Sequence, residues 1–221
     1  MRFPVIILAG GLSTRMGTDK SLLLLGQNSF LGSIISEMLV LSREIVVTVG
    51  RKETQAYAAF RENDKVSIIR DEEYIESPLG GMLTGFKHVH EDYAAVLACD
   101  SPLVKGSIVS HLFASAAGRD AAVPIWDIAD KMTTEPLCAV YKVESARRAI
   151  LQILEENGKK ACREMVLRLP SVRFVSASDL RTFDRELDSL RNINTKKDYE
   201  DLVAERRPSS GEIAVALAVK E

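Results

Sequence analysis

The feature that most constrains the fold is a series of short apolar runs, rich in β-branched residues, separated by longer amphipathic stretches. Seven runs occur, at residues 4–9, 44–49, 66–70, 94–99, 121–126, 137–143 and 172–177. They are almost continuously apolar rather than alternating, which is typical of strands covered on both faces. The sequence therefore predicts a mainly parallel central sheet.

Helical patterns occupy the stretches between these runs. They cover residues 30–41, 79–90, 108–117 and 144–156, and Thr195 is the expected N-cap of a further helix. The alternation of strand and helix predicts an α/β fold built from βαβ units, with helices on both sides of the sheet. Residues 126–135 lack a regular pattern, and we expect a surface loop there.

The length of 221 residues suits one large α/β domain better than two small ones. We predict a single domain over residues 1–206. The tail, residues 207–221, begins with the turn-forming letters RPSSG, and it forms either an edge strand or a mobile segment.

Composition and charge disfavour several classes of function. The net charge is −2, whereas a protein that binds nucleic acid usually has a basic excess. No apolar stretch approaches the roughly 20 residues that a membrane span needs. Cys99, Cys138 and Cys162 are far apart and form no CxxC pair, which disfavours zinc and disulfide frameworks. We therefore expect a cytoplasmic protein that binds neither nucleic acid nor a membrane.

The first strand runs into a glycine-rich loop at residues 8–20, LAGGLSTRMGTDK. Gly10 and Gly11 let backbone N–H groups approach a phosphate closely, while Arg15 and Lys20 supply positive charge. The spacing fits neither GxxxxGK[ST] nor GxGxxG, so a P-loop and a dinucleotide-binding turn are disfavoured. The loop predicts a polyphosphate ligand, and a surface turn with solvated charges is the alternative.

Two carboxylates follow predicted strands. Asp100 comes directly after the run at 94–99, and a carboxylate beside a phosphate loop suits Mg²⁺, which prefers oxygen ligands. Asp71 follows the run at 66–70. For both residues the alternative is turn or capping chemistry.

Two asparagines lie near the end of the predicted domain. Asn192 and Asn194 are two residues apart, so their amides point the same way if the chain is extended there. The alternative is local hydrogen bonding within a turn.

The loop sequence LAGGLSTRMGTDK resembles the nucleotidyltransferase signature LAGGxSxRMGxxK, and most closely that of molybdenum cofactor guanylyltransferases. Four further pieces fall in the expected order: RDEEYIESPLGGM, LACDSPL, EPLCAVYKV and RNINTKKDYEDL. The resemblance covers roughly residues 4–204. It implies a three-layer nucleotide-diphospho-sugar transferase-like fold with a Rossmann-like nucleotide-binding half.

The resemblance also implies an activity, which is transfer of GMP from GTP to molybdopterin with release of pyrophosphate. It implies catalytic roles for Arg15, Lys20 and Asp100, with Mg²⁺ held by Asp100. The implied nucleotide-binding residues are Leu8, Ala9, Gly10, Gly11, Lys20, Asp71 and Asp100. Asn192 and Asn194 would bind the pterin-bearing substrate, and transient contact with cofactor-biosynthesis or acceptor proteins is expected.

Three positions depart from the pattern of that family. Thr48 stands where many members have Asn, Ser77 where Gly is frequent before Pro-Leu, and Glu135 where His is common before Pro. The alternatives are a related transferase that uses CTP or another phosphorylated acceptor, and a non-catalytic nucleotide-binding protein on the same fold.

Overall fold

The computed structural model describes residues 2–11, 19–71, 75, 77–128, 131–156 and 160–206. Arg15 and the tail at 207–221 lie outside the described residues. The catalytic role of Arg15, the form of the tail and the domain boundary at residue 206 therefore stay predictions.

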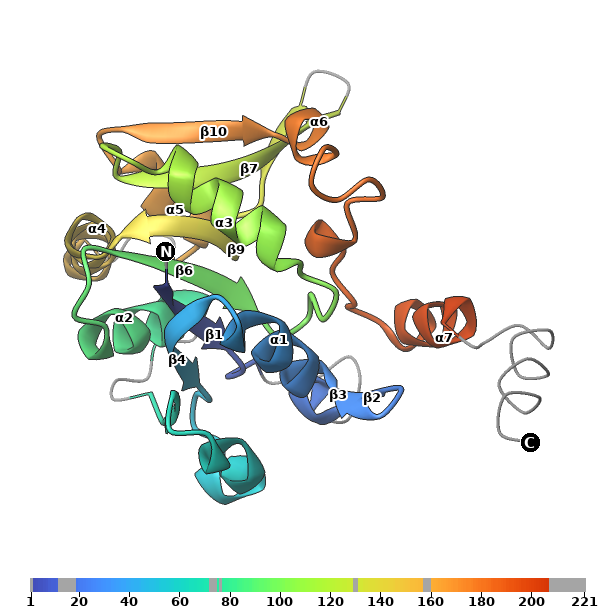
Figure 1. Ribbon diagram of the computed structural model, residues 1–221. Coiled ribbons are helices and arrows are strands. Elements are labelled where there is room, and N and C mark those ends of the chain that lie inside the picture. Colours follow the sequence, from blue (N-terminus) through green and yellow to red (C-terminus); the bar gives the residue numbers. More distant parts are fainter. Residues whose placement is uncertain are drawn as a thin grey trace, which may run out of the picture.

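An eight-stranded sheet forms the centre of the molecule (Figure 1). Its main path has the order β10 (Val172–Ser176), β7 (Ala121–Ile128), β9 (Cys138–Lys142), β6 (Tyr93–Ala98), β1 (Phe3–Leu8), β4 (Ser42–Thr48) and β5 (Val66–Ile69). β8 (Lys131–Thr134) pairs with β7. β9 runs antiparallel to β6 and β7, as β8 does to β7, and the other pairs are parallel. The predicted mainly parallel sheet is confirmed.

Each of the seven predicted strands overlaps an observed strand, but the loop expected at residues 126–135 is wrong. β7 continues to Ile128 and pairs with β8 in a hairpin, where Trp126 lies opposite Thr133. Trp and Thr have high β-propensity. The sequence of residues 126–135 does not reveal this hairpin, because it lacks the continuous apolar run that marks a strand buried on both faces.

Helices cover both faces of the sheet, which gives the predicted three layers (Figure 1). α1 (Phe30–Leu39), α3 (Gly106–Ser115) and α6 (Ala177–Leu180) pack on one face. α2 (Pro78–His88), α4 (Val143–Glu155) and α5 (Cys162–Leu167) pack on the other. Successive side chains of β1 point to opposite faces of the sheet: Ile7 packs with the layer of α1, α3 and α6, and Ile6 packs with the layer of α2, α4 and α5.

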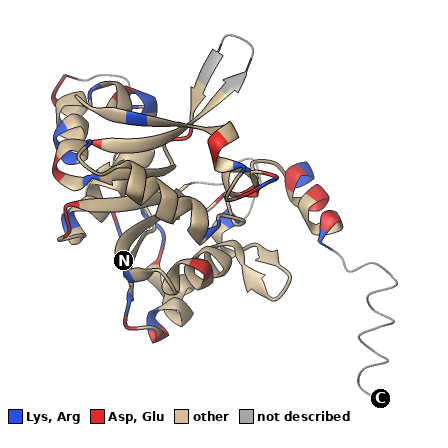
Figure 2. Ribbon diagram, turned by 45° about the horizontal axis from the view of Figure 1, so that its top comes forward, with Lys and Arg blue, Asp and Glu red and all other residues tan. Residues whose placement is uncertain are grey.

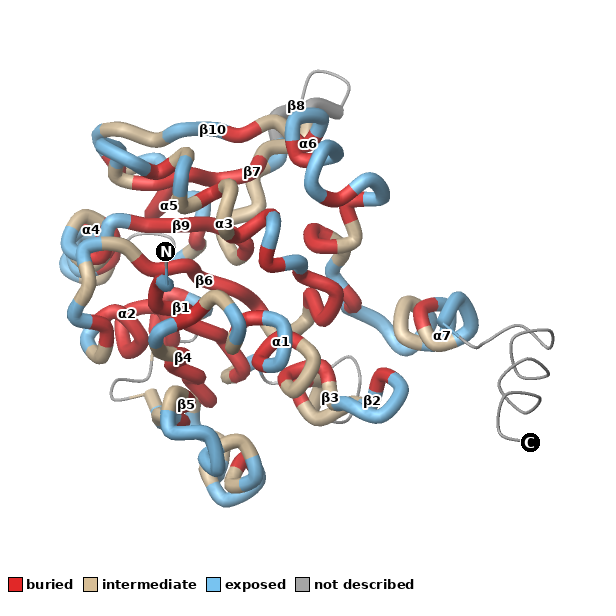
Figure 3. Tube along the Cα trace, viewed as in Figure 1, coloured by how far each residue is buried: buried red, intermediate tan, exposed pale blue. Residues whose placement is uncertain are grey.

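Burial follows this layering, and the strands and the inner sides of the helices form the interior (Figure 3).

The shorter elements are η1 (Lys20–Leu22), β2 (Leu24–Leu25), β3 (Asn28–Ser29), η2 (Thr54–Glu62) and η3 (Asp188–Leu190). A small separate cluster attaches α7 (Lys196–Glu205) beside α1. It consists of Leu25, Phe30, Leu103, Ile193 and Leu202.

Charged residues of both signs lie on α4 and α7, whereas α3 carries none and the central strands are mostly uncharged (Figure 2). In the described part of the chain, no helix is long and apolar enough to span a membrane. The predicted cytoplasmic location stays a prediction.

Candidate functional site

The carboxyl ends of the parallel strands β1, β4 and β6 lie level with one another. Ala9 N–H donates to the carbonyl of Thr48 at 2.8 Å, and Cys99 N–H donates to the carbonyl of Leu8 at 3.1 Å. The segments that leave these strands therefore meet at one edge of the sheet. In open α/β sheets ligands bind beyond this edge.

A cleft of about 580 Å³ lies along this edge. Six of the predicted nucleotide-binding residues line it: Leu8, Gly10, Gly11, Lys20, Asp71 and Asp100. Ala9, the seventh, is fully buried and does not line the cleft. Residues from the ends of β1, β5 and β6 are therefore brought together as the sequence predicts.

The backbones of Gly10 and Gly50 touch one another across the floor of this cleft. A Cβ on Gly10 would lie 2.8 Å from the Gly50 nitrogen, and one on Gly50 would lie 2.9 Å from the Gly10 oxygen. Gly50 also has a φ of +64°, a left-handed conformation that favours glycine. A Cβ on Gly11 would meet nothing within 4 Å among the described residues, so its backbone faces open space.

Lys52 joins the two ends of the glycine-rich loop. Its Nζ donates to the carbonyl of Ala9 at 2.6 Å and to Asp19 Oδ1 at 2.7 Å. The buried Tyr57 hydroxyl donates to Asp19 Oδ2 at 2.6 Å, and Ser21 donates to Oδ1 through both N–H and hydroxyl. Burial alone would raise the pKa of Asp19, but the hydrogen bonds from Lys52, Tyr57 and Ser21 lower it below its usual range.

This cluster fixes the residue that precedes Lys20, and sequence analysis missed Lys52 and Tyr57. Neither belongs to the glycine-rich motif, and Lys52 lies in the polar stretch GRKET. The burial of Tyr57 and its hydrogen bond to Asp19 both raise the pKa of its phenol. These pKa shifts keep Asp19 ionised and Tyr57 neutral at neutral pH, and Lys52 forms an ion pair with Asp19.

Asp100 carries a carboxylate oxygen that has no hydrogen-bond partner among the residues that the structure describes. Its Oδ1 is buried and accepts no hydrogen bond within the described residues. Burial raises the pKa of Asp100, although the positive charge of Lys20 opposes the shift. A buried oxygen that lacks a hydrogen bond is costly unless a ligand completes it, so a cation fits this position.

The described protein groups would not complete the coordination shell of a metal ion by themselves. Across the described residues, no cluster of three or more His, Cys, Asp or Glu side chains is arranged to hold a metal ion. A hard cation such as Mg²⁺ needs only one or two carboxylates when phosphate oxygens and water complete its shell.

Asp71 lies at the far side of the cleft from Asp100, after β5. Its Oδ1 accepts from Gly50 N–H at 3.1 Å, and its own N–H donates to the Gly50 carbonyl at 3.0 Å. Burial raises the pKa of Asp71, and the hydrogen bond from Gly50 opposes the shift. Asp71 therefore holds the turn at Gly50, after β4, and it also lines the cleft.

The start of α2 forms one wall of the cleft. Ser77 is the N-cap and accepts from Leu79 N–H at 3.0 Å. A Cβ on Gly81 would lie 2.8 Å from Thr48 Oγ1, so this glycine permits close packing of the helix on β4.

A smaller cavity of about 190 Å³ adjoins the cleft, and Asp100 and Leu137 line both. Asn192 and Asn194 line the smaller cavity, as does Glu135. Backbone pairing places them there, because the N–H of the buried Ile193 donates to the carbonyl of Asp100 at 2.8 Å. The two amides thus share one cavity, as their spacing predicts.

The asparagine side chains bond to distant partners rather than within a local turn. Asn192 Oδ1 accepts from the Ser101 hydroxyl at 2.8 Å, and Asn194 Oδ1 accepts from Lys20 Nζ at 3.0 Å. Lys20 therefore touches the element that bears the asparagines while it also lines the cleft.

Comparison with known proteins identifies the family. Residues 5–172 match the model of the MobA-like NTP transferase domain. The chain belongs to the MobA-like NTP transferase family. This membership confirms the predicted family and the enzyme class, a nucleotidyltransferase.

Relatives within the family share the length of this chain. It is 31% identical to a probable molybdenum cofactor guanylyltransferase of Methanosarcina mazei, over 93% of this chain and 92% of the relative. It is 28% identical to a molybdenum cofactor guanylyltransferase of Shewanella sp. (strain MR-4), over 93% and 97%.

Two solved structures share the fold. The molybdopterin-guanine dinucleotide biosynthesis protein A of Archaeoglobus fulgidus matches with a TM-score of 0.76 and 26% identity, covering 91% of this chain and 97% of that one. A 2-C-methyl-D-erythritol 4-phosphate cytidylyltransferase of Thermus thermophilus matches with a TM-score of 0.69 and 15% identity, over 92% and 98%. The second likeness concerns the fold alone.

The three positions that depart from the family pattern all lie at the two cavities. Thr48 and Ser77 line the larger one, and Glu135 lines the smaller. Thr48 is fully buried, and its Oγ1 has no hydrogen-bond partner in the described part of the chain. The side chains that line the cavities at these three positions therefore differ chemically from the Asn, Gly and His of the family pattern.

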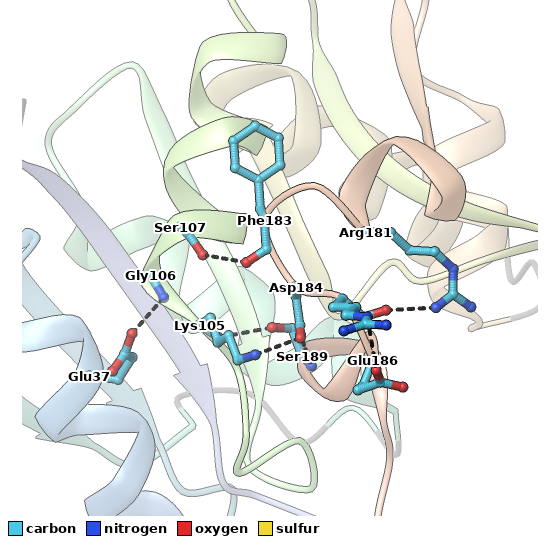
Figure 4. A network of polar contacts seen from close by, with 10 residues as sticks. Glu37, Lys105, Gly106, Ser107, Arg181, Phe183, Asp184, Glu186 and Ser189 are labelled. Carbon is cyan, nitrogen blue, oxygen red and sulfur yellow. Dashed lines mark hydrogen bonds and ion pairs between the residues drawn. The ribbon is translucent and has the colours of Figure 1, made fainter.

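A polar network supports the segment that carries the asparagines (Figure 4). Asp184 is buried and accepts from Lys105 Nζ at 2.6 Å and from Ser189 N–H at 2.7 Å. The N–H of Lys105 donates back to the Ser189 hydroxyl at 3.0 Å. These bonds attach the chain just before Asn192 to the start of α3.

Proposed function

We propose that this MobA-like NTP transferase transfers GMP from GTP to molybdopterin, forming a guanine dinucleotide and releasing pyrophosphate. The observation that carries the proposal is the position of Asp100, which lines both a large cleft and an adjoining smaller cavity. A transferase must bring two substrates to one point, and this residue marks the point where the two cavities meet. The names of the relatives supply the identities of the nucleotide and the acceptor.

The larger cleft suits the triphosphate. Gly10 and Gly11 expose backbone at its floor, and Lys20 and Arg51 bring positive charge to its lining. Asp71 and Thr48 line the part formed by β4 and β5 and would meet the base or ribose. Arg15 would add a second cation from the glycine-rich loop, as the family resemblance implies.

The reaction needs positioning and charge neutralisation rather than a protein nucleophile. A terminal phosphate oxygen of the acceptor attacks the α-phosphorus of GTP. The bond from the α-phosphorus to the bridging oxygen of the β-phosphate breaks, and pyrophosphate leaves with the electron pair. Lys20 stabilises the negative charge that develops, and Asn194 orients its ammonium through their hydrogen bond.

The residues present fit Mg²⁺. Asp100 would hold it, since its buried Oδ1 has no hydrogen bond within the described residues. When bound, the ion supplies charge neutralisation at the phosphates, whose oxygens and water would complete its coordination.

A pyrophosphate-release assay tests the proposal. The purified protein is mixed with molybdopterin, Mg²⁺ and GTP, CTP or ATP in turn, with acceptor-free mixtures as controls. We expect acceptor-dependent release with GTP alone. A clear preference for CTP would favour the related transferase. Tight GTP binding without release of pyrophosphate would favour a nucleotide-binding protein that does not catalyse transfer.

A further inference from the structure

The smaller cavity contains a carboxylate that the phosphate chemistry does not use. Glu135 lies in the turn between β8 and β9, is half-buried, and lines the cavity beside Asp100 and Asn192. The turn itself is fixed, because Glu135 N–H donates to the Pro124 carbonyl at 2.9 Å and its own carbonyl accepts from Cys138 N–H at 3.2 Å. The backbone therefore holds this side chain at the cavity.

Neighbouring donors fix the carboxylate further. Trp126 Nε1 donates to Glu135 Oε1 at 2.8 Å. The side chain of Asn192 lies close to Glu135 and lowers the pKa of its carboxyl group, while its Oδ1 accepts from the Ser101 hydroxyl. Asn192 thus turns its NH₂ group toward the carboxylate. An ionised carboxylate has about four acceptor positions, so two donors leave room for a ligand.

The charge of the cavity selects what enters it. Two carboxylates, Asp100 and Glu135, line it, and no Lys, Arg or His does so among the described residues. Burial raises the pKa of Glu135 above its usual value; the donors Trp126 and Asn192 oppose this shift, and the charge of Asp100 adds a little to it. A phosphate would be repelled here, whereas a neutral ring that carries N–H donors would satisfy the remaining acceptor positions.

A pterin ring has such an edge. Its 2-amino group and the adjacent ring N–H form a planar pair of donors that matches a carboxylate, in the same way that the fork of Arg does. We propose that Glu135 is a specificity-determining residue that accepts hydrogen bonds from the amino-pyrimidinone edge of the acceptor's pterin ring. This inference rests on the proposed function, because that function supplies a pterin-bearing acceptor.

The test compares two fluorescent ligands that differ at one group. Pterin carries the 2-amino group, and lumazine carries a carbonyl oxygen in its place. Fluorescence titration of the full chain should show at least tenfold tighter binding of pterin, since a buried acceptor loses its partner in the lumazine complex. In Glu135→Gln we expect pterin affinity to fall about ten- to a hundredfold and lumazine affinity to change little.

One control variant and one further test variant separate this effect from a general loss of structure. Glu44→Gln removes the charge of another half-buried glutamate, on β4, that lines neither cavity, and it should leave both affinities unchanged. Trp126→Phe removes the donor to Oε1 but keeps an aromatic ring, so it should reduce the preference for pterin by a smaller factor. This second variant keeps the test decisive if Glu135→Gln does not fold.

The inference is overturned if Glu135→Gln keeps the pterin-to-lumazine ratio of the parent, or if the parent binds no pterin up to millimolar concentration. It is also overturned if Glu135→Gln weakens GTP binding, measured by calorimetry, as much as pterin binding. These titrations contain no turnover, so failure of pyrophosphate release with intact pterin selectivity would refute the proposed function alone.

Discussion

The two cavities that meet at Asp100 are built from different chemistry. The larger has two glycines at its floor, and Lys20 and Arg51 in its lining. The smaller has amides and carboxylates, with no cationic side chain among its described lining residues. This difference supports the proposed placement of a polyphosphate in the first cavity, where the cations and the exposed glycine backbone lie beside Asp71 and Asp100, and of a donor-rich neutral group in the second.

The direction of one strand explains why the second cavity exists. β9 runs antiparallel to β6, and Cys138 pairs with Leu97, so β9 begins at the edge where β6 ends. The turn before β9 therefore lies beside Asp100, and Ala98 N–H donates to the Leu137 carbonyl at 2.9 Å. A fully parallel sheet would place that turn, and Glu135 with it, at the opposite edge.

Asp100→Ala should have the largest effect, because Asp100 lines both cavities and its carboxylate is lost from both. We expect turnover to fall at least about a hundred- to a thousandfold, the loss typical when a group that stabilises charge is removed. Folding should persist, because Oδ1 makes no hydrogen bond in the described part of the chain. Pyrophosphate release measures turnover, and thermal unfolding measures stability. Asp64→Ala, at an exposed aspartate, is the control. Normal turnover in Asp100→Ala would remove this residue from the mechanism.

Lys20→Met should act mainly on the larger cavity. We expect about a hundredfold loss in kcat/KM for GTP, since the ammonium at the phosphate-binding turn is lost. A smaller rise in the acceptor KM should accompany it, because Asn194 loses its hydrogen bond to Lys20 Nζ. Lys196→Met, at a highly exposed lysine on α7, is the matched control. An equal effect on both substrates would contradict the assignment of the cavities.

Lys52→Met tests whether the ends of the glycine-rich loop must be held together. Its Nζ contacts Ala9 and Asp19, so its loss should lower kcat/KM for GTP about tenfold and the free energy of unfolding by about 1–3 kcal/mol. Steady-state kinetics and urea denaturation check these values. Lys52→Arg should restore part of both, and a variant that loses stability but keeps full activity would restrict Lys52 to a structural role.

The residues of the larger cavity could be predicted from the sequence, because several of them follow strands that the apolar runs already indicate. Gly10, Asp71 and Asp100 come directly after buried apolar runs, and the carboxyl ends of parallel strands share an edge. Local sequence thus carried enough information to bring these residues together.

The smaller cavity and the support around the loop could not be predicted in the same way. An apolar run does not reveal the direction of its strand, so the sequence could not predict that β9 runs antiparallel to its neighbours. Lys52 meets Asp19 across 33 residues of sequence, and only tertiary packing brings them together. Polar hairpins such as β7–β8 and short helices such as α5 and α6 give too weak a periodic signal.

Asp184→Asn should weaken the support of the segment that bears Asn192 and should affect the acceptor more than the nucleotide. Lys105 and Ser189 donate hydrogen bonds to this buried carboxylate, so we expect the free energy of unfolding to fall by about 1–3 kcal/mol. The loss should lie at the lower end of this range, because the Lys105 side chain is about half exposed to solvent. The acceptor KM should rise several-fold while the KM for GTP stays unchanged. A rise in both KM values would mean that the segment supports the whole site.

The same variant has a defined pH dependence. Burial alone would raise the pKa of Asp184, but hydrogen bonds from Lys105 and Ser189 lower it below its ordinary value. A lowered folded-state pKa stabilises the protein above the unfolded-state pKa, and this contribution is lost as pH falls through the folded-state value. The difference in unfolding free energy between parent and Asp184→Asn should therefore be constant near neutral pH and shrink in acid.

Thr48→Val should give the smallest effect and addresses the larger cavity alone. Valine has nearly the same shape as threonine, and Oγ1 of the buried Thr48 has no hydrogen bond within the described residues, so the stability should be unchanged or slightly higher. If this hydroxyl meets the nucleotide, GTP affinity measured by calorimetry should fall less than tenfold, the usual contribution of one neutral hydrogen bond. Pterin affinity should not change, because Thr48 lines only the larger cavity. A loss of pterin binding without a loss of GTP binding would reverse the assignment of the two cavities.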